Sequence, residues 1–232
     1  MTEISYAPPA EQPQAAPGSF PRRVLDTFLS PLAMFQRFGA RPPWVDVTLL
    51  SMVLMVGAMA MIPARVFEGT LREAMAQRGQ AMPAGAEQMA GVQRIFALGS
   101  AAFGPWIGLV ITAGLLTLVF SVVMGGKASF RQYLSVAAHA GLIGAVGMWA
   151  KLPIILQKEN MAAGISLAAL VPSADPAGFL YKFLTAWEVF AVWQFVVLAL
   201  GVSALGRKVG TGTALAVILG CYALVMAGFA AL

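Results

Sequence analysis

The sequence predicts an all-α, polytopic membrane protein with five transmembrane helices and amphipathic juxtamembrane helices. Of its 232 residues, 59% are hydrophobic and only 11% are charged, whereas an ordinary globular domain has about 25% charged residues. A hydrocarbon core about 30 Å thick takes roughly 20 helical residues and strongly penalises charge. Five stretches long enough to cross it contain no Asp, Glu, Lys or Arg: 47–64, 95–126, 132–150, 189–206 and 209–232.

The residues before the first apolar stretch divide into two parts. Residues 1–19 are polar and rich in Pro, Ala and Gln, and they lack the features of a cleaved secretory signal, so we expect a disordered cytoplasmic tail. Residues 20–43 alternate apolar and basic residues, which predicts two short interfacial helices, the second beginning at Pro31 after Ser30. The alternative is a solvated linker. Four basic residues are candidate lipid-headgroup contacts: Arg22, Arg23, Arg37 and Arg41.

The transmembrane domain is expected over 44–232. Pro63 should end the first span, and the charged stretch that follows should contain amphipathic helix with a turn at 79–85. Gly104-Pro105 should kink or break the long second stretch. The apolar residues 164–171 are too few to cross, which predicts a re-entrant or interfacial segment. We expect the spans at about 44–62, 106–124, 132–156, 183–205 and 211–231.

The basic residues of the shortest loops predict the orientation. Loops 125–131 and 206–210 each carry two basic residues and no acidic residue, whereas the two long loops have nearly balanced charge. Because short basic loops stay in the cytoplasm, we expect the amino terminus inside and the carboxyl terminus outside. The net charge of +5 is then attributed to juxtamembrane residues that face anionic lipids, with no nucleic-acid partner.

Two ionisable residues in the predicted spans share one depth. Lys151 lies about 28 Å along its span from Gln132, and Glu188 lies about 27 Å from Gly206, both toward the outer leaflet. We hypothesise that Lys151 meets Glu188 where a stripe of small residues lets the third and fourth spans approach closely. Alternatively, Lys151 extends to the outer headgroups while Glu188 faces a hydrated crevice. The stripe consists of Gly147, Gly144, Gly141 and Ala137.

His139 is the third candidate for an intramembrane polar site. It lies about 10 Å into the third span, at a depth matched only by the acidic residue Asp46. A neutral imidazole that hydrogen-bonds to a neighbouring helix is the favoured interpretation, and a proton relay is the alternative. Asp46 itself is expected to cap or anchor the first helix.

The sequence lacks the motifs of the common enzyme classes. It has no His-Glu-x-x-His, no Gly-x-Ser-x-Gly, no phosphate-binding Gly-x-x-x-x-Gly-Lys-Ser/Thr and no Gly-x-Gly-x-x-Gly after a strand. One Cys and one His are too few for a structural zinc site. We therefore assign no catalytic, cofactor-binding or metal-binding residue, and we expect a protein that is not an enzyme.

Several segments together resemble the Ypt-interacting-protein (Yip/YIPF) family of membrane proteins. The likeness runs from about Ser30 to the carboxyl end, and its most specific part is Trp187-Glu188-Val189-Phe190-Ala191-Val192-Trp193-Gln194. Glu188 stands where the family would have Asp. The other matching segments are Ser30-Pro31-Leu32-Ala33-Met34-Phe35, Gly-Gly-Lys-Ala-Ser-Phe-Arg-Gln-Tyr-Leu entering the third span, and Leu152-Pro153.

The resemblance implies a multi-pass protein with a cytoplasmic amino terminus. In eukaryotes it also implies prenylated small GTPases as partners and a role in vesicle traffic, whereas bacterial-type members have no settled activity. The preference for Arg over Lys and the many Ala and Gly residues resemble bacterial usage, which favours the bacterial inner membrane.

Two functions remain open at this stage. The leading interpretation is a non-enzymatic membrane protein that organises lipids or binds a protein partner, including a second copy of itself. The alternative is a small-solute or ion transporter or channel that uses Glu188 and Lys151, with His139, near Gly104-Pro105.

Overall fold

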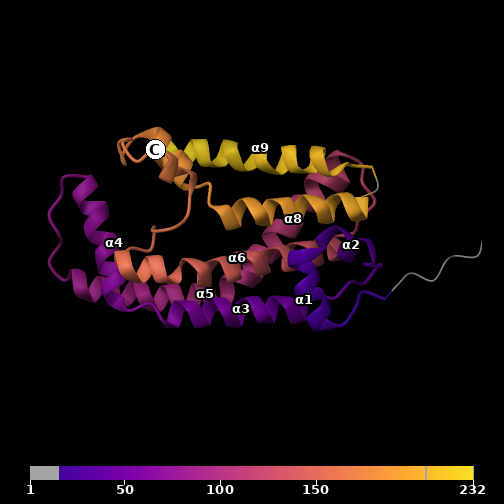
Figure 1. Cartoon of the computed structure of the whole chain (residues 1–232), viewed down its shortest axis with the longest axis horizontal. Helices are drawn as coiled ribbons and strands as arrows, with labels where there is room; N and C mark the ends of the chain where they lie inside the picture. Colours follow the sequence, from indigo (N-terminus) through magenta and orange to yellow (C-terminus); the bar gives the residue numbers. More distant parts are fainter. Residues whose placement is uncertain (1–15, 207, 232) are drawn as a thin grey trace, which may run out of the picture.

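The computed structural model describes residues 16–206 and 208–231, and this part of the chain is built from helices joined by turns and loops. The long helices run side by side along the longest axis of the molecule (Figure 1). The predicted tail 1–19 lies outside the described residues except for 16–19. The long helices are α3 (Val45–Ala60), α5 (Ala86–Leu116), α6 (Phe130–Lys158), α8 (Val189–Gly206) and α9 (Thr211–Ala230).

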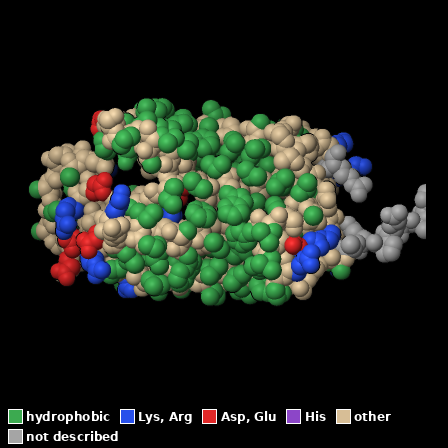
Figure 2. Space-filling model, in the orientation of Figure 1, with side chains coloured by type: hydrophobic (Ala, Val, Ile, Leu, Met, Phe, Trp, Pro, Cys, Tyr) green, Lys and Arg blue, Asp and Glu red, His purple; other side chains and the backbone are tan. Residues whose placement is uncertain are grey.

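The length and apolar composition of these helices support a polytopic membrane fold. In the described residues, three helices could cross a membrane: α6, α9, and α5 together with the π-helix η1 (Thr117–Val123). Helix α3 qualifies only jointly with α4 (Ala64–Gln77), from which it is bent by 79°, and α8 is shorter. Hydrophobic side chains cover the middle of the molecule in Figure 2, while most charged side chains gather at its two ends. Three or four spans therefore meet the requirements for crossing.

Helix α6 occupies the centre of the bundle and packs against α3, α5 and α8. Small residues make the close packing with α8 possible. A Cβ atom added to Gly147 would lie 2.6 Å from the Phe190 ring, and one added to Gly201 would lie 2.4 Å from Val136. The predicted stripe thus packs on α8 near Gly147 and Gly144, whereas a Cβ at Gly141 would meet no atom within 4 Å.

Helix α5 differs from the sequence expectation because it runs through Pro105 without a break. Of the predicted kink or break at Gly104-Pro105, the break does not occur, because the α-helix is continuous from Ala86 to Leu116. Proline removes one helical hydrogen bond, but ending a helix inside a membrane would leave several more backbone groups unpaired. Arg94, on the early part of α5, donates to the carbonyl oxygens of Ala60 and Ile62 at 3.2 and 2.8 Å and so satisfies the end of α3.

The segment before α8 also differs from the expectation. The predicted span at 183–205 is interrupted, because α7 (Phe179–Thr185) ends before residues 186–188, which are not helical. Residues 164–171 do not cross the bundle and form the short 3₁₀-helix η2 (Leu167–Leu170). An antiparallel bridge joins Ser166 to Glu188. Glu188 therefore lies outside a helix, directly before α8.

The short predicted helices and turns agree with the structure. Helices α1 (Phe20–Leu29) and α2 (Pro31–Gln36) form, and Ser30 occupies the N-cap position of α2. Helix α4 begins after Pro63, and a turn with positive φ at Gly79 and Gly85 separates it from α5.

Candidate functional site

Lys151 and Glu188 form an ion pair between α6 and the start of α8. The Nζ atom of Lys151 donates to Oε2 of Glu188 at 2.7 Å. The two side chains retain 19% and 28% of their accessible surface, so the pair is neither sealed nor freely solvated. The structure thus brings together the two residues whose matching depth suggested a contact.

Backbone hydrogen bonds of the residues directly before and after Glu188 fix its position. The amide of Leu167 donates to the Trp187 carbonyl oxygen at 3.0 Å, and the amide of Val189 donates to the Ile165 carbonyl oxygen at 3.2 Å. The Glu188 carbonyl oxygen accepts from Val192 in the first turn of α8. Its carboxylate therefore lies at a helix N-terminus, where the helix dipole also favours negative charge.

Helix α9 supports the same turn from the other side. The Tyr222 hydroxyl donates to the Ala186 carbonyl oxygen at 2.6 Å. The Tyr222 ring also meets the Trp187 ring edge to face, with centroids 5.3 Å apart. These contacts hold the non-helical residues in front of α8 and so orient Glu188 toward Lys151.

Gly164 allows the connecting loop to pass close to the ion pair. A Cβ atom at this position would lie 2.9 Å from Oε1 of Glu188 and 3.3 Å from Cδ of Lys151. Because contacts this short require the neighbouring atoms to move, only glycine fits here without displacing the pair.

The ion pair lines a half-open crevice of about 420 Å³ among α3, α5, α6 and α8. Most of the wall consists of Gly, Ala and other small or apolar side chains, and Gly104 and Pro105 belong to it. Two hydroxyl groups on the α3 side are engaged within their own helix, since Thr48 and Ser51 donate to the carbonyl oxygens of the residues four positions earlier. The crevice thus has a mostly apolar wall, in which Ser100, Thr112 and Gln194 are further polar side chains, and an edge formed by the ion pair.

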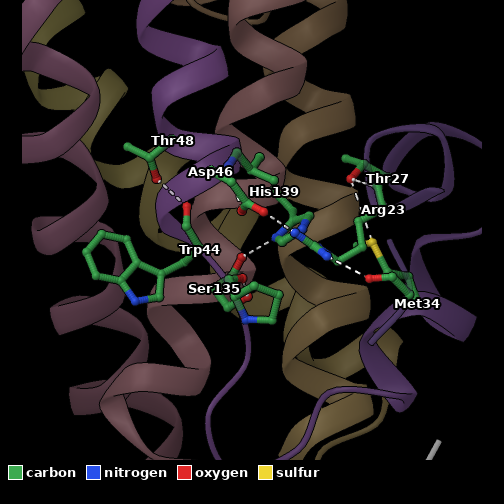
Figure 3. A network of polar contacts seen from close by, with 11 residues as sticks. Arg23, Thr27, Met34, Trp44, Asp46, Thr48, Ser135 and His139 are labelled. Atoms are coloured by element: carbon green, nitrogen blue, oxygen red, sulfur yellow. Dashed lines mark hydrogen bonds and ion pairs between the residues drawn. The ribbon is translucent and has the colours of Figure 1, made fainter. Parts of the chain in front are cut away.

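His139 lies near the other end of α6 and is fully buried. Figure 3 shows its ring beside Arg23 and Asp46, with a contact from Nδ1 to the Ser135 carbonyl oxygen at 2.8 Å. This partner belongs to its own helix, one turn earlier, and not to a neighbouring helix as expected. The ring packs against Phe35 and Phe38, with centroids 6.1 and 5.3 Å away. The structure does not bring His139 to the Lys151–Glu188 pair.

Arg23 turns into the protein and forms an ion pair with Asp46 at the start of α3 (Figure 3). It also donates to the Gly18 carbonyl oxygen at 2.7 Å, and it is only 5% exposed. The expectation that Arg23 contacts lipid headgroups is therefore wrong, because burial keeps its guanidinium away from the surface. Asp46 was expected to cap or anchor the first span, and in the structure it attaches the start of α3 to Arg23 on α1.

Asp26 gathers two further arginines on the α1 side. Arg37 donates to its carboxylate at 2.5 Å, while Arg22 lies 3.4 Å away and keeps 65% of its side-chain surface. Burial alone would raise the pKa of the Asp26 carboxyl, but the hydrogen bonds from Arg37 and Ser30 and the charges of Arg22 and Arg37 hold that pKa below its ordinary value. Arg22 and Arg41 remain accessible to headgroups.

Sequence reasoning missed the Arg23–Asp46 contact and the approach of Gly164 to the ion pair. The amphipathic pattern of α1 gave no indication that one arginine faces inward. Among residues 16–206 and 208–231, no three His, Cys, Asp or Glu side chains gather to hold a metal ion. What the described geometry offers is a half-open crevice with an ion pair at its edge.

The bundle of long apolar helices with charged side chains gathered at its ends defines a multi-pass integral membrane protein. The sequence profile of the Yip1 domain family matches residues 25–232, so the chain belongs to this family. It is 27% identical to the membrane protein YknW of Bacillus subtilis (strain 168) over 183 residues, which cover 76% of this chain and 75% of the relative. No solved structure matches it.

Proposed function

We propose that this protein is a non-enzymatic, five-span membrane protein that binds and organises lipids. The five spans are α3, α5 with η1, α6, α8 and α9, which lie side by side in Figure 1. Helix α8, at 18 residues, is about 27 Å long and is sufficient for a thin hydrocarbon core. The carboxyl end lies at the end of the bundle that is far from α1 (Figure 1). An odd number of spans places the two ends of the chain on opposite sides in this way.

For its location we propose the bacterial inner membrane, with the amino terminus in the cytoplasm and the carboxyl terminus outside. The start of α6 lies at the α1 end of the bundle, since Gln132 donates to the Gly39 carbonyl oxygen at 3.2 Å. The loop that enters α6 therefore shares one end with α1 and α2, and so does the loop between α8 and α9 (Figure 1). Both loops are basic and short, which favours the cytoplasmic side.

The observation that carries the lipid proposal is the crevice of about 420 Å³ with its ion-paired edge. Cavities of roughly 300–1,000 Å³ hold small molecules. A transmembrane helix about 10 Å wide and 30 Å long needs several times more space. A partner helix therefore cannot enter the crevice, whereas a lipid can place its headgroup and part of an acyl chain there and leave the rest of its chains outside.

The surface helices support the same function. Helix α1 is strongly amphipathic, and its outward residues include Leu25, Leu29 and the accessible Arg22. Such a face enters the headgroup boundary while the arginine stays with the phosphates. The inward face is attached to the bundle through Arg23 and Asp46, so lipid contacts of α1 would be transmitted to α3.

Lipid retention tests this function. The full chain is purified in mild detergent from membranes, and its bound phospholipid is quantified by mass spectrometry against a detergent blank. We expect phospholipid to remain at a defined stoichiometry after extensive washing. Loss of all lipid together with a stable co-purified protein, or a stable dimer without lipid, would contradict the proposal in favour of a protein partner or a second copy.

A carrier is the second candidate, because the crevice reaches both charged residues and passes Gly104 and Pro105. Buried charges beside helix irregularities are typical of solute pathways. A proteoliposome flux assay separates the two functions. Ion- or pH-dependent uptake that Glu188→Gln abolishes would establish the carrier, whereas the lipid-binding function predicts no uptake above protein-free vesicles.

A further inference from the structure

We propose that the crevice beside Lys151 and Glu188 binds a zwitterionic phospholipid with a primary amine, of the phosphatidylethanolamine type. The lipid phosphate would face Lys151, its ammonium group would face Glu188, and its acyl chains would occupy the apolar part of the crevice. This inference rests on the proposed lipid-binding function and specifies the class of lipid.

Charge balance selects a zwitterion. The pair is neutral as a whole, and each side chain keeps accessible surface toward the surroundings. An anionic or a cationic headgroup would add one unbalanced charge to a site where charge is expensive, whereas a zwitterion leaves the total at zero. The ligand therefore carries one charge of each sign.

Hydrogen-bond chemistry selects the amine. Glu188 is an acceptor only, and Lys151 is a donor only, so a ligand must offer N–H groups to the first and oxygen atoms to the second. A primary ammonium has three N–H donors, whereas a quaternary choline headgroup has none. Phosphatidylethanolamine satisfies both partners, and phosphatidylcholine satisfies only Lys151.

The remaining surface of the crevice suits acyl chains. Besides the ion pair, the wall of the crevice includes Gly104, Gly108, Gly141, Gly144 and Leu109. Added Cβ atoms at Gly104, Gly108 and Gly141 would meet nothing within 4 Å, so the space beside these backbones is open. An apolar chain that fills this space removes hydrophobic wall from contact with water.

The test uses the full chain in nanodiscs prepared from equal amounts of phosphatidylethanolamine, phosphatidylcholine and phosphatidylglycerol. Lipids that stay bound after transfer into detergent are quantified by mass spectrometry. We expect about tenfold enrichment of phosphatidylethanolamine over phosphatidylcholine, because the hydrogen bonds to a charged acceptor are lost with choline. The Lys151→Gln/Glu188→Gln double variant should lose this enrichment. The exposed pair of Arg72 and Glu68 provides the matched control, as Arg72→Gln/Glu68→Gln.

A second pair of variants keeps the test decisive if the double variant fails to fold. Gly108→Leu fills the crevice and leaves the ion pair intact, whereas Gly114→Leu adds the same side chain to α5 outside the crevice. We expect Gly108→Leu to reduce bound phosphatidylethanolamine at least severalfold and Gly114→Leu to leave it unchanged.

The outcomes separate the two proposals. Retained lipid without a preference for phosphatidylethanolamine, or a preference unaffected by Gly108→Leu, would overturn this inference and leave the lipid-binding function standing. Absence of retained lipid would overturn both. Soluble glycerophosphoethanolamine has the same headgroup without acyl chains. If calorimetry shows that it binds with the same affinity as phosphatidylethanolamine, the inference is also overturned, because the acyl chains would then contribute nothing.

Discussion

The ammonium group of Lys151 lies 2.7 Å from the carboxylate of Glu188, a residue 37 positions later in the chain. Reversing either charge, as Lys151→Glu or Glu188→Lys, places two like charges together in a partly buried site. We expect each single variant to lose roughly 2–3 kcal/mol of stability. The Lys151→Glu/Glu188→Lys double variant should recover most of this loss, as measured by thermal unfolding in detergent.

The double-mutant cycle also has a clear contrary result. If the double variant is as unstable as the sum of the two single variants, the residues do not interact. The accessible pair of Arg72 and Glu68 serves as a reference, because exposed i, i+4 pairs contribute only about 0.3–0.5 kcal/mol.

Close packing between α6 and α8 depends on Gly147. Its replacement by Ala would force a methyl group against the Phe190 side chain, so we expect Gly147→Ala to destabilise the protein by about 1–3 kcal/mol. Gly141→Ala is the matched control on the same helix, since its Cβ meets no atom within 4 Å and alanine favours a helix by about 0.5–1 kcal/mol. A lower midpoint of thermal unfolding for Gly141→Ala than for Gly147→Ala would contradict the packing described here.

The attachment of α1 to the bundle depends on Arg23. Its replacement by Gln removes the positive partner of Asp46, so we expect faster deuterium uptake by the backbone amides of α1 and a loss of about 1–3 kcal/mol. Arg22→Gln provides the comparison, because this accessible arginine should change stability by no more than about 0.5 kcal/mol. Equal deuterium uptake in the two variants would show that Arg23 does not hold α1.

Acid should weaken the contact between α1 and α2. The pKa of Asp26 is held below its ordinary value of 3.8, so its charge stabilises the folded state above that value and the contribution is lost as the pH falls through the lowered pKa. We therefore expect the unfolding temperature to fall below about pH 4. Asp26→Asn should be less stable at neutral pH and lose less on acidification. An identical pH profile for both proteins would exclude Asp26 from this transition.

The sequence alone predicted the elements whose signals are local. Charge-free runs identify α3, α6, α8 and α9, because a bilayer imposes both their length and their composition. Matching depth made the contact between Lys151 and Glu188 one of two alternatives, since both residues lie nearly equally far from the same end of adjacent helices, but it did not decide between them. Ser30 and Pro31 located the start of α2 because a proline at the first helical position loses no hydrogen bond.

The parts that could not be predicted depend on distant contacts. Pro105 is a helix breaker by local rules, yet α5 continues through it within a bundle that favours unbroken helix. Arg22 and Arg23 are equivalent in an amphipathic pattern, and only the position of Asp46 on α3 separates the buried arginine from the accessible one. Glu188 was expected within a helix, but the bridge to Ser166 keeps it outside one.

The arrangement of five spans with opposite termini is the claim on which the other proposals depend. We would replace Cys221 by Ala and introduce Ser19→Cys or Ala231→Cys separately, then treat intact cells with a membrane-impermeant maleimide. The account predicts labelling of Ala231→Cys in intact cells, and labelling of Ser19→Cys only after the membrane is permeabilised. Labelling of both positions from the same side would contradict it.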